Sequence, residues 1–320
     1  MVRLGVLLPS RGLFLREGRP PDPGLILAMA ELAEAHGFDS VWVGDSLTSK
    51  PRLEPLSVLA AVATRTHRVR LGTAVLLPAL RPPVPLAHSI GTVDYLSRGR
   101  LVLGMGVGGA FTADMEREWW AAGVNPDERM GRLEETIDVL HQLWTGEEVA
   151  FKGKYFSFGP DTVRPLPVNG RIPILLACHS HTGSERQLRR AARVGDGIIS
   201  ITASPTAYKD LRERVWRYGI EAGRDPTGWE AAFYTTVNIG IDPGVAEAEA
   251  QDFLMKYYRV NHWGAQWGPF GHADVVAKRL KEYVAAGATT LIVRFASYRP
   301  LQQLDIFANE VLPQIRGGVS

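Results

Sequence analysis

The chain has 320 residues, of which 45% are hydrophobic and 22% are charged, as in an ordinary globular protein. Its formal net charge of +2 comes without a basic stripe, which argues against nucleic acid as a partner, and no apolar run reaches the roughly 18 residues of a membrane span. The N-terminal segment lacks the features of a signal peptide, and Cys178 is the only cysteine, which excludes an internal disulfide. We therefore expect a cytoplasmic protein.

Short apolar runs alternate with helical patterns through the first third of the chain. Apolar residues at helical spacing, followed by Gly37 where a C-terminal cap belongs, predict a helix over 25–36. Further helices are expected at 55–66 and 85–96. The expected strands cover 4–8, 40–43, 69–77 and 101–107.

The alternation continues with longer connections. A strongly amphipathic helix is expected over 130–144, and a small hairpin over 151–158. The remaining strands are expected at 172–178, 197–201, 232–239 and 289–295. The remaining helices are expected at 184–194, 206–222, 245–258, 273–286 and 301–315.

Eight strands, each followed by a helix, predict an α/β protein with a (β/α)8 barrel. An open doubly wound sheet is the alternative, but no linker or shift in composition divides the chain, which favours one barrel domain over residues 1–320. Active sites of such barrels lie at the C-terminal ends of the strands. Candidate functional residues are therefore sought at those ends.

A glycine-rich segment follows the fourth expected strand. Gly104, Gly106, Gly108 and Gly109 come directly after the apolar run 101–103. Glycine allows positive φ and lets a ligand lie against bare backbone, so the segment suits a flat or phosphorylated cofactor. A tight turn beside a bulge is the structural alternative.

The turn after the fifth expected strand is a second candidate. Gly183 and Ser184 stand at the start of a helix, where free N–H groups and the helix dipole favour phosphate. Ser184 is equally suited to be a plain N-cap. His179 lies at the end of the same strand, but its spacing from the other histidine nearby, His181, matches no zinc signature, so no metal site is expected.

Other strand ends and loops carry polar and aromatic candidates. Asp45, followed by Ser46, ends the second strand and could contact a cofactor or cap the next helix. Arg294 at the end of the eighth strand could pair with an anionic substrate or cofactor tail, or close a salt bridge beneath the loops. Loop aromatics can wall an apolar pocket, pack the loops or form a dimer face. The aromatic candidates for a substrate pocket are Phe111, Trp263 and Trp267.

Several segments together resemble the bacterial luciferase-like superfamily of flavin- and deazaflavin-dependent oxidoreductases. The resemblance spans about the whole chain, and its fourth-strand motif is specific in combination with the later Gly-Asp-Gly. The segments that carry it are LAEAHGFDSVWVGD at 32–45, LGTAV at 71–75, LSRGRLVLGMGVG at 96–108, GSER at 183–186 and RVGDG at 193–197.

The resemblance implies a TIM barrel with insertions after strands 4 and 7, and an isoalloxazine or deazaflavin ring over the strand ends. Ala74 and Val75 match the position where deazaflavin-using members have a non-proline cis peptide behind the ring. Asp45 matches an acid near the ring, and with Ser46 it forms the expected catalytic pair. The cofactor contacts are expected from Gly106, Val107, Gly108, His179, Gly183 and Ser184. A homodimer is also implied.

The chain departs from the pattern at two positions. Ser46 replaces a histidine that follows the strand-two acid in several relatives, and Gly109 replaces a glutamate of a sugar-phosphate dehydrogenase branch. The resemblance therefore implies hydride transfer with F420 on a small organic substrate, by other residues than in that branch. The alternative is an FMN-dependent two-component monooxygenase that oxygenates an apolar substrate and receives reduced flavin from a separate reductase.

Two other classes remain as rivals. A lyase or aldolase on this fold would need a lysine at a strand end, and none of the candidate ends has one. A non-catalytic binding protein would have bulky residues blocking the barrel mouth, whereas Gly106, Gly108 and Gly109 leave it open.

Overall fold

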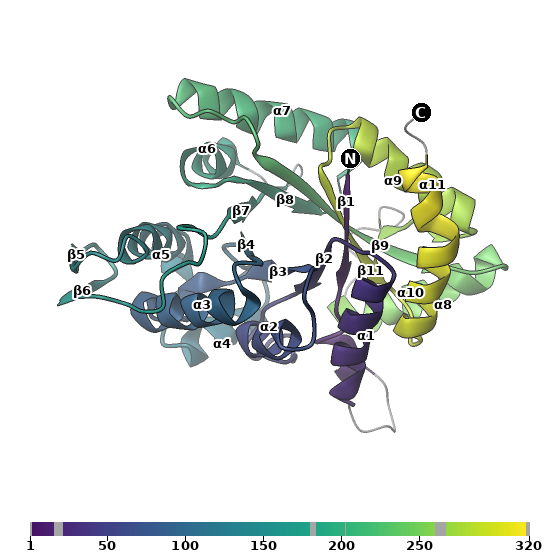
Figure 1. Cartoon of the computed structure of the whole chain (residues 1–320), viewed down its shortest axis with the longest axis horizontal. Helices are drawn as coiled ribbons and strands as arrows, with labels where there is room; N and C mark the ends of the chain where they lie inside the picture. Colours follow the sequence, from purple (N-terminus) through teal and green to yellow (C-terminus); the bar gives the residue numbers. More distant parts are fainter. Residues whose placement is uncertain (1, 16–21, 180–183, 202, 260–266, 318–320) are drawn as a thin grey trace.

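A closed barrel of eight parallel strands forms the centre of the molecule in the computed structural model, which describes residues 2–15, 22–179, 184–201, 203–259 and 267–317 (Figure 1). The predicted (β/α)8 barrel is confirmed, since β9 pairs with both β8 and β11 and β11 pairs with β1, which closes the sheet. The barrel strands are β1 (Arg3–Leu7), β2 (Ser40–Val43), β3 (Arg70–Leu76), β4 (Leu101–Met105), β7 (Ile174–Ala177), β8 (Gly197–Ile201), β9 (Glu230–Ile239) and β11 (Thr290–Phe295).

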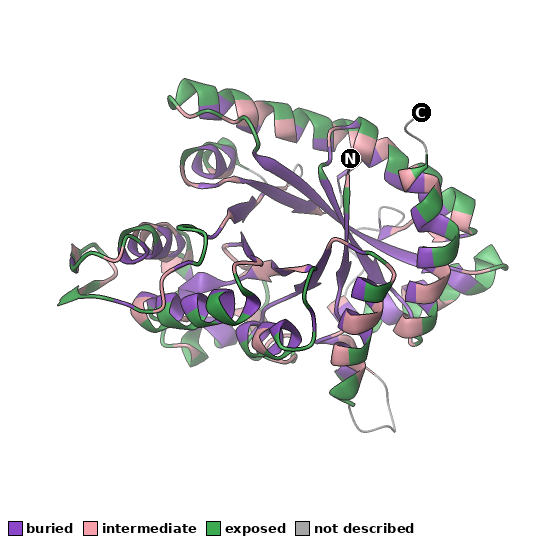
Figure 2. Ribbon diagram, viewed as in Figure 1, coloured by how far each residue is buried: buried purple, intermediate pink, exposed green. Residues whose placement is uncertain are grey.

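Helices surround the barrel, and most of the strands are buried on both faces (Figure 2). The helices are α1 (Gly24–Ala35), α2 (Pro55–Ala63), α3 (Pro83–Ser97), α4 (Ala113–Ala121), α5 (Arg129–Leu143), α6 (Glu185–Val194), α7 (Pro205–Glu221), α8 (Pro243–Tyr258), α9 (Ala273–Ala285), α10 (Pro300–Ile306) and α11 (Leu312–Arg316). None of the helices in these ranges is long and apolar enough to cross a bilayer.

Alternation of side chains along each strand separates an inner from an outer core. The inner core lies inside the barrel and consists of Leu7, Trp42, Val102, Leu175, Ile199, Ala232, Tyr234 and Ile292. The outer core, made by the opposite strand faces and the apolar stripes of the helices, is larger. The continuous apolar runs of the sequence follow from this double burial.

The two longest connections follow β4 and β9. The first contains α4, α5 and an antiparallel hairpin of β5 (Val149–Lys152) and β6 (Ser157–Asp161). The second contains α8, the short strand β10 (Phe270–Gly271) and α9. The expected hairpin at 151–158 is therefore present with wider bounds.

Some expected elements differ from the observed ones. α4 was absent from the expectations because its polar sequence has no apolar stripe, although the side chain of Thr112 caps it by accepting a hydrogen bond from the Met115 N–H. The fourth strand ends at Met105 instead of residue 107. The last expected helix, at 301–315, consists of α10, a π-helical turn at Phe307–Val311 and α11.

Glu230 at the N-terminal end of the barrel joins three strands. Its carboxylate lies 3.2 Å from Arg3 and 2.9 Å from Arg70, and it accepts a 2.5 Å hydrogen bond from Thr290. We expect Glu230→Gln to lower the free energy of unfolding by about 2 kcal/mol, because the buried carboxylate loses its ion pairs with Arg3 and Arg70 and the amide that replaces it satisfies fewer of the donors around it. Thermal denaturation beside the exposed control Glu213→Gln would measure this, and equal Tm values for both variants would refute it.

Candidate active site

A cavity of about 270 Å³ opens at the C-terminal ends of the barrel strands, where barrel enzymes have their active sites. We call it the mouth cavity. Its wall consists of residues from β3, β7, β8, β9, α4 and α8 and from the loops after β2, β3, β4 and β7. Of the predicted site residues it includes Asp45, Ser46, Ala74, Val75, Gly108 and His179.

The floor of the mouth cavity contains a bulge in β3. The peptide bond between Ala74 and Val75 is cis, as the family resemblance implies, and the pairing of β3 with β4 shifts register between Thr73 and Leu76. Ala74 and Val75 both line the cavity and are only partly buried. The bulge thereby presents these two small side chains to a ligand.

The glycines after β4 keep the cavity open. A Cβ on Gly106 would lie 2.7 Å from Cγ2 of Val75, so no larger residue fits beside the bulge. Gly108 has φ of +74°, and a Cβ there would lie 2.8 Å from the Trp119 ring. The backbone after β4 can approach a flat ligand only because these positions lack side chains. Gly106 and Val107 themselves do not line the cavity.

Asp45 is held in an ion pair. Its Oδ2 atom accepts a 2.6 Å hydrogen bond from Nη1 of Arg81 and a 2.9 Å bond from the Leu77 N–H, and its Oδ1 atom lies 3.1 Å from Nη2 of Arg81. The carboxylate thus ties the end of β2 to the segment after β3. It borders the cavity with its acceptor capacity largely engaged, which fits a positioning role better than that of a free base.

Ser46 belongs to a loop organised by Glu118 of α4. The Ser46 hydroxyl donates a 2.6 Å hydrogen bond to Oε1 of Glu118, which also accepts from the N–H groups of Leu47, Thr48 and Ser49. Burial raises the pKa of Glu118, but the hydrogen bonds from Ser46, Thr48 and Ser49 outweigh burial and leave the pKa below its usual value. Glu118 therefore stays ionised and fixes one wall of the cavity.

Another part of the lining is cationic and aromatic, and we call it the cationic wall. Lys50 and Arg52 line the cavity with Tyr257 and Tyr258 of α8. The Lys50 Nζ lies 5.3 Å from the Tyr258 ring centre. Sequence reasoning missed this wall and Glu118, because the tyrosines lie in a helix pattern and the cations in a loop, and nothing local in the sequence brings them together.

Tyr257 lies among three guanidinium groups. The Cζ atoms of Arg294, Arg11 and Arg52 are 4.5, 5.2 and 5.9 Å from its ring centre. Burial raises the pKa of Tyr257, but the charges of Arg52, Arg294 and Arg11 together lower it below its usual value. A phenol that ionises more readily can accept or donate a proton at the mouth cavity.

We expect Tyr257 to ionise below the ordinary tyrosine pKa of about 10, because the phenolate is the form that the three arginines favour. The near-ultraviolet phenolate absorbance of the wild type, minus that of Tyr257→Phe, should report one group titrating below that value. Tyr95→Phe, at an exposed tyrosine, is the control. A difference curve with its midpoint at or above 10 would contradict the expectation.

The predicted phosphate seat is described only in part. Ser184 is the N-cap residue of α6, is exposed, and its side chain forms no capping hydrogen bond. Gly183 lies outside the described residues, whereas His179 lines the mouth cavity. The neighbouring Cys178 is buried, and burial raises the pKa of its thiol to about 12, which does not suit a nucleophile.

Among the described residues, Phe111, Trp267 and Arg294 do not line the mouth cavity. Phe111 is 73% exposed. Trp267 is buried, stacks on Tyr258 at 4.6 Å and lies 5.4 Å from the Arg294 guanidinium. Arg294 is also buried and lines a neighbouring cavity. Trp263 falls outside the described part of the chain.

Solved structures with the same fold support the architecture. The monooxygenase RslO1 from Streptomyces bottropensis aligns with a TM-score of 0.81 at 23% identity, covering 97% of this chain and 99% of that one. An F420-dependent secondary alcohol dehydrogenase in complex with an F420-acetone adduct aligns with a TM-score of 0.80 at 22% identity, covering 98% and 99%.

Sequence comparison extends over nearly the whole chain. An F420-dependent glucose-6-phosphate dehydrogenase of Nakamurella multipartita is 28% identical over 323 residues, covering 92% of this chain and 93% of the relative. An uncharacterized protein of Mycobacterium tuberculosis is 36% identical over 221 residues, covering 62% and 74%. The model of the luciferase-like monooxygenase family matches residues 2–292. The chain therefore belongs to the luciferase-like monooxygenase family.

Proposed function

We propose that this protein is an oxidoreductase that transfers a hydride between the deazaflavin cofactor F420 and a small organic substrate. The observation that carries the proposal is the mouth cavity, which is lined by Ala74 and Val75 of the β3 bulge and by Gly108 and Gly109 of the glycine segment after β4. Relatives at 28% identity over 92% of the chain are named F420-dependent dehydrogenases, which supports this choice of cofactor. When bound, the deazaflavin ring supplies the hydride chemistry.

The residues present fit a flat ring with a phosphorylated tail. We assign the ring face to Ala74 and Val75, and the close backbone approach to Gly106, Val107 and Gly108, because side chains at the glycines would fill the cradle. We assign the tail to Ser184, the N-cap residue of α6, together with Gly183, which precedes it in the sequence, and His179, which follows β7. Backbone N–H groups and the dipole of that helix favour a phosphate there.

The wall residues position the ring and move the proton. In this proposal Asp45 with Arg81, and Ser46 with Glu118, hold the two loops that border the ring. Tyr257 takes the proton that leaves the substrate hydroxyl when the hydride departs, or returns it in the reverse direction. Tyr257 would take the role of the histidine and the glutamate of some relatives, which this chain replaces with Ser46 and Gly109. Phe111, Trp263 and Trp267 remain proposed surroundings of the substrate, whereas Arg294 lines the neighbouring cavity.

Titration of the purified protein with F420 and, separately, with FMN tests this function through quenching of cofactor fluorescence. Tight binding of F420 and none of FMN is the expected result. Tight binding of FMN alone would replace hydride transfer by the two-component monooxygenase, which needs a separate flavin reductase. Binding of neither would refute the proposed function and leave only the barrel.

We also propose that the chain forms a homodimer, as the family resemblance implies. Light scattering during size-exclusion chromatography measures the mass in solution directly. A mass near 70 kDa, twice the 35.1 kDa of one chain, is expected. A mass near 35 kDa at micromolar concentration would refute the dimer.

A further inference from the structure

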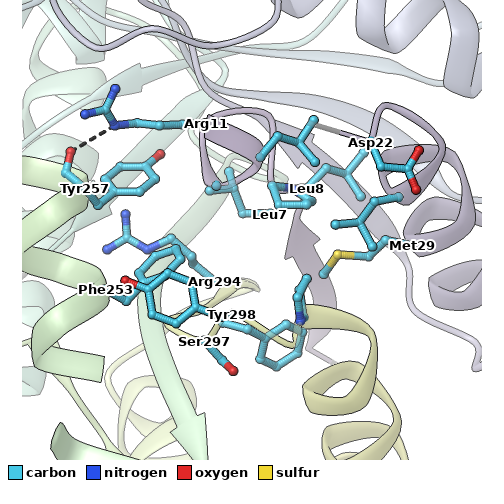
Figure 3. Close-up of a pocket in the computed structure, with 16 residues that line it drawn as sticks. Leu7, Leu8, Arg11, Asp22, Met29, Phe253, Tyr257, Arg294, Ser297 and Tyr298 are labelled. Carbon is cyan, nitrogen blue, oxygen red and sulfur yellow. Dashed lines mark hydrogen bonds between the residues drawn. The ribbon is translucent and has the colours of Figure 1, made fainter. Parts of the chain in front are cut away.

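A second cavity, of about 240 Å³, lies beside the mouth cavity between the ends of β1 and β11 and helices α1 and α8 (Figure 3). We call it the side cavity. Tyr257 lines both cavities and forms part of the wall between them. None of the described residues assigned above to the cofactor ring or its tail lines this cavity, so it offers space for a second ligand.

The side cavity is apolar at one end and cationic at the other. Leu7, Leu8 and Met29 belong to its apolar wall, whereas Arg11 and Arg294 lie near Tyr257 at the other end (Figure 3). The remaining apolar lining comes from Pro9, Leu13, Leu25, Phe253, Phe295 and Pro300. This division matches an amphipathic ligand with a charged head and an apolar tail.

Both arginines are buried without a counter-charge among the described residues. Arg11 is 4% exposed and Arg294 is 3% exposed, and neither forms an ion pair there. Arg11 donates to the backbone oxygens of Tyr257 and Pro51. Arg294 donates hydrogen bonds to Tyr258 and Thr236, and its Nε is buried without a hydrogen-bond partner in the described chain.

The electrostatic surroundings of Arg11 are also cationic. Burial, together with the nearby charge of Arg52, lowers the pKa of Arg11 to about 10. The acidic side chain of the cavity lining, Asp22, lies at the end away from Arg294 in Figure 3 and accepts a hydrogen bond from the Gly24 N–H. A buried cation of this kind is stabilised when an anion is brought to it.

We propose that the side cavity is a binding site for a small organic acid, whose carboxylate lies at the cationic end formed by Arg294, Arg11 and the Tyr257 ring and whose aliphatic chain lies against Leu8, Leu25 and Met29. Guanidinium groups bind carboxylates with charge-assisted hydrogen bonds. The ligand is small, because the volume of about 240 Å³ is below the range of about 300–1,000 Å³ typical of drug-sized sites.

An inorganic anion fits the side cavity less well. Phosphate would meet the two arginines but would leave the apolar wall of Leu8, Leu25 and Met29 facing an unfilled volume. A neutral aliphatic molecule would fill that volume but leave the guanidinium charges uncompensated. A carboxylate with a chain of about six carbons satisfies both ends, since its buried methylene groups add free energy of binding to that of the head group.

Calorimetric titration of the cofactor-free protein with hexanoate, 1-hexanol and inorganic phosphate tests the site. Hexanoate should bind at one site per chain and at least about tenfold more tightly than either other probe. Arg294→Gln should weaken hexanoate binding about 10- to 100-fold, the loss expected for hydrogen bonds to a charged group. The control Arg217→Gln removes an exposed arginine of α7 and should change nothing.

A second variant guards against misfolding of Arg294→Gln. Leu25 is only partly buried, so Leu25→Trp should fold, fill the apolar end and weaken hexanoate and 1-hexanol alike. In the wild type, hexanoate should also reduce the phenolate absorbance of Tyr257. The bound carboxylate and the phenolate are both anions that Arg11 and Arg294 stabilise, so binding of one disfavours formation of the other.

Several outcomes would overturn the organic-acid site. Equal affinity for 1-hexanol and hexanoate would show that the arginines recognise no charge. Phosphate binding as tightly as hexanoate would show a bare anion site. Unchanged hexanoate affinity in Leu25→Trp would place the ligand elsewhere. These readouts need no cofactor, so a failure of the F420 titration would leave them untouched.

Discussion

Replacing Ala177 with phenylalanine should weaken the binding of F420 at least about 100-fold. Ala177 ends β7, lines the mouth cavity and is only partly buried. It lies next to the bulge, since a Cβ on Gly106 would be 2.7 Å from Val75 and 3.4 Å from the Ala177 Cβ. A phenyl ring at this position would occupy the space assigned to the cofactor ring. The strand that carries it is densely packed and cannot shift to make room for both rings.

The same change should have a small effect on stability. The new ring points into an existing cavity of about 270 Å³, so the overpacking penalty of about 1–3 kcal/mol for a filled core marks its upper limit. Fluorescence titration with F420, with Tm as the check on folding, measures both effects. Ala222→Phe, at an exposed position after α7, is the matched control. Undiminished F420 affinity in a folded Ala177→Phe protein would place the cofactor outside the mouth cavity.

The barrel could be predicted because its signal is local. Apolar runs such as 101–103 and glycines such as Gly37 and Gly287 mark strand and helix ends within a few residues of themselves. α4 could not be predicted, because which of its side chains are buried depends on the segments of the chain that pack against it. Its Trp119 is buried and Trp120 is exposed. Two adjacent tryptophans carry no helical periodicity, so the sequence does not indicate which of them is buried.

The site could be predicted only where the backbone itself forms it. Strand ends placed Asp45, the Ala74–Val75 bulge and Gly108 at the barrel mouth, and the family resemblance implied the cis peptide. The partners of these groups come from distant segments. Arg81 reaches Asp45 across 36 positions and Glu118 reaches Ser46 across 72, so neither pair leaves a spacing in the sequence.

Arg294 illustrates the same limit. The sequence left two readings open, a pair with an anion or a salt bridge beneath the loops. In the described residues no carboxylate pairs with it, and its neighbours are the rings of Tyr234, Tyr257, Tyr258 and Trp267. Burial lowers the pKa of Arg294, but the tyrosines raise it by a larger amount, so the guanidinium stays charged. This environment favours the first reading.

Replacing Glu118 with glutamine should destabilise the protein by about 3 kcal/mol and also weaken cofactor binding. The carboxylate is buried and accepts hydrogen bonds from the Ser46 and Ser49 hydroxyls and from three consecutive N–H groups. Glutamine keeps one acceptor oxygen, but its NH₂ group would face the hydroxyl and N–H donors of the Ser46–Ser49 loop. Some of these donors would then be buried without an acceptor. Because Ser46, Ser49 and Lys50 line the mouth cavity, a loosened loop should reduce F420 affinity about tenfold or more.

The pH dependence separates this role from simple packing. The folded-state pKa of Glu118 is lowered, so its contribution to stability is fully present above the unfolded-state pKa of about 4.5 and is lost as the pH falls through the folded-state value. The Tm gap between wild type and Glu118→Gln should therefore be constant near neutral pH and narrow below about pH 4.5. Glu116→Gln, at an exposed position of the same helix, should show no gap at any pH. A gap for Glu118→Gln that persists unchanged into acid would mean that the side chain stabilises the loop by shape alone, and that its charge contributes nothing to the wall of the cavity.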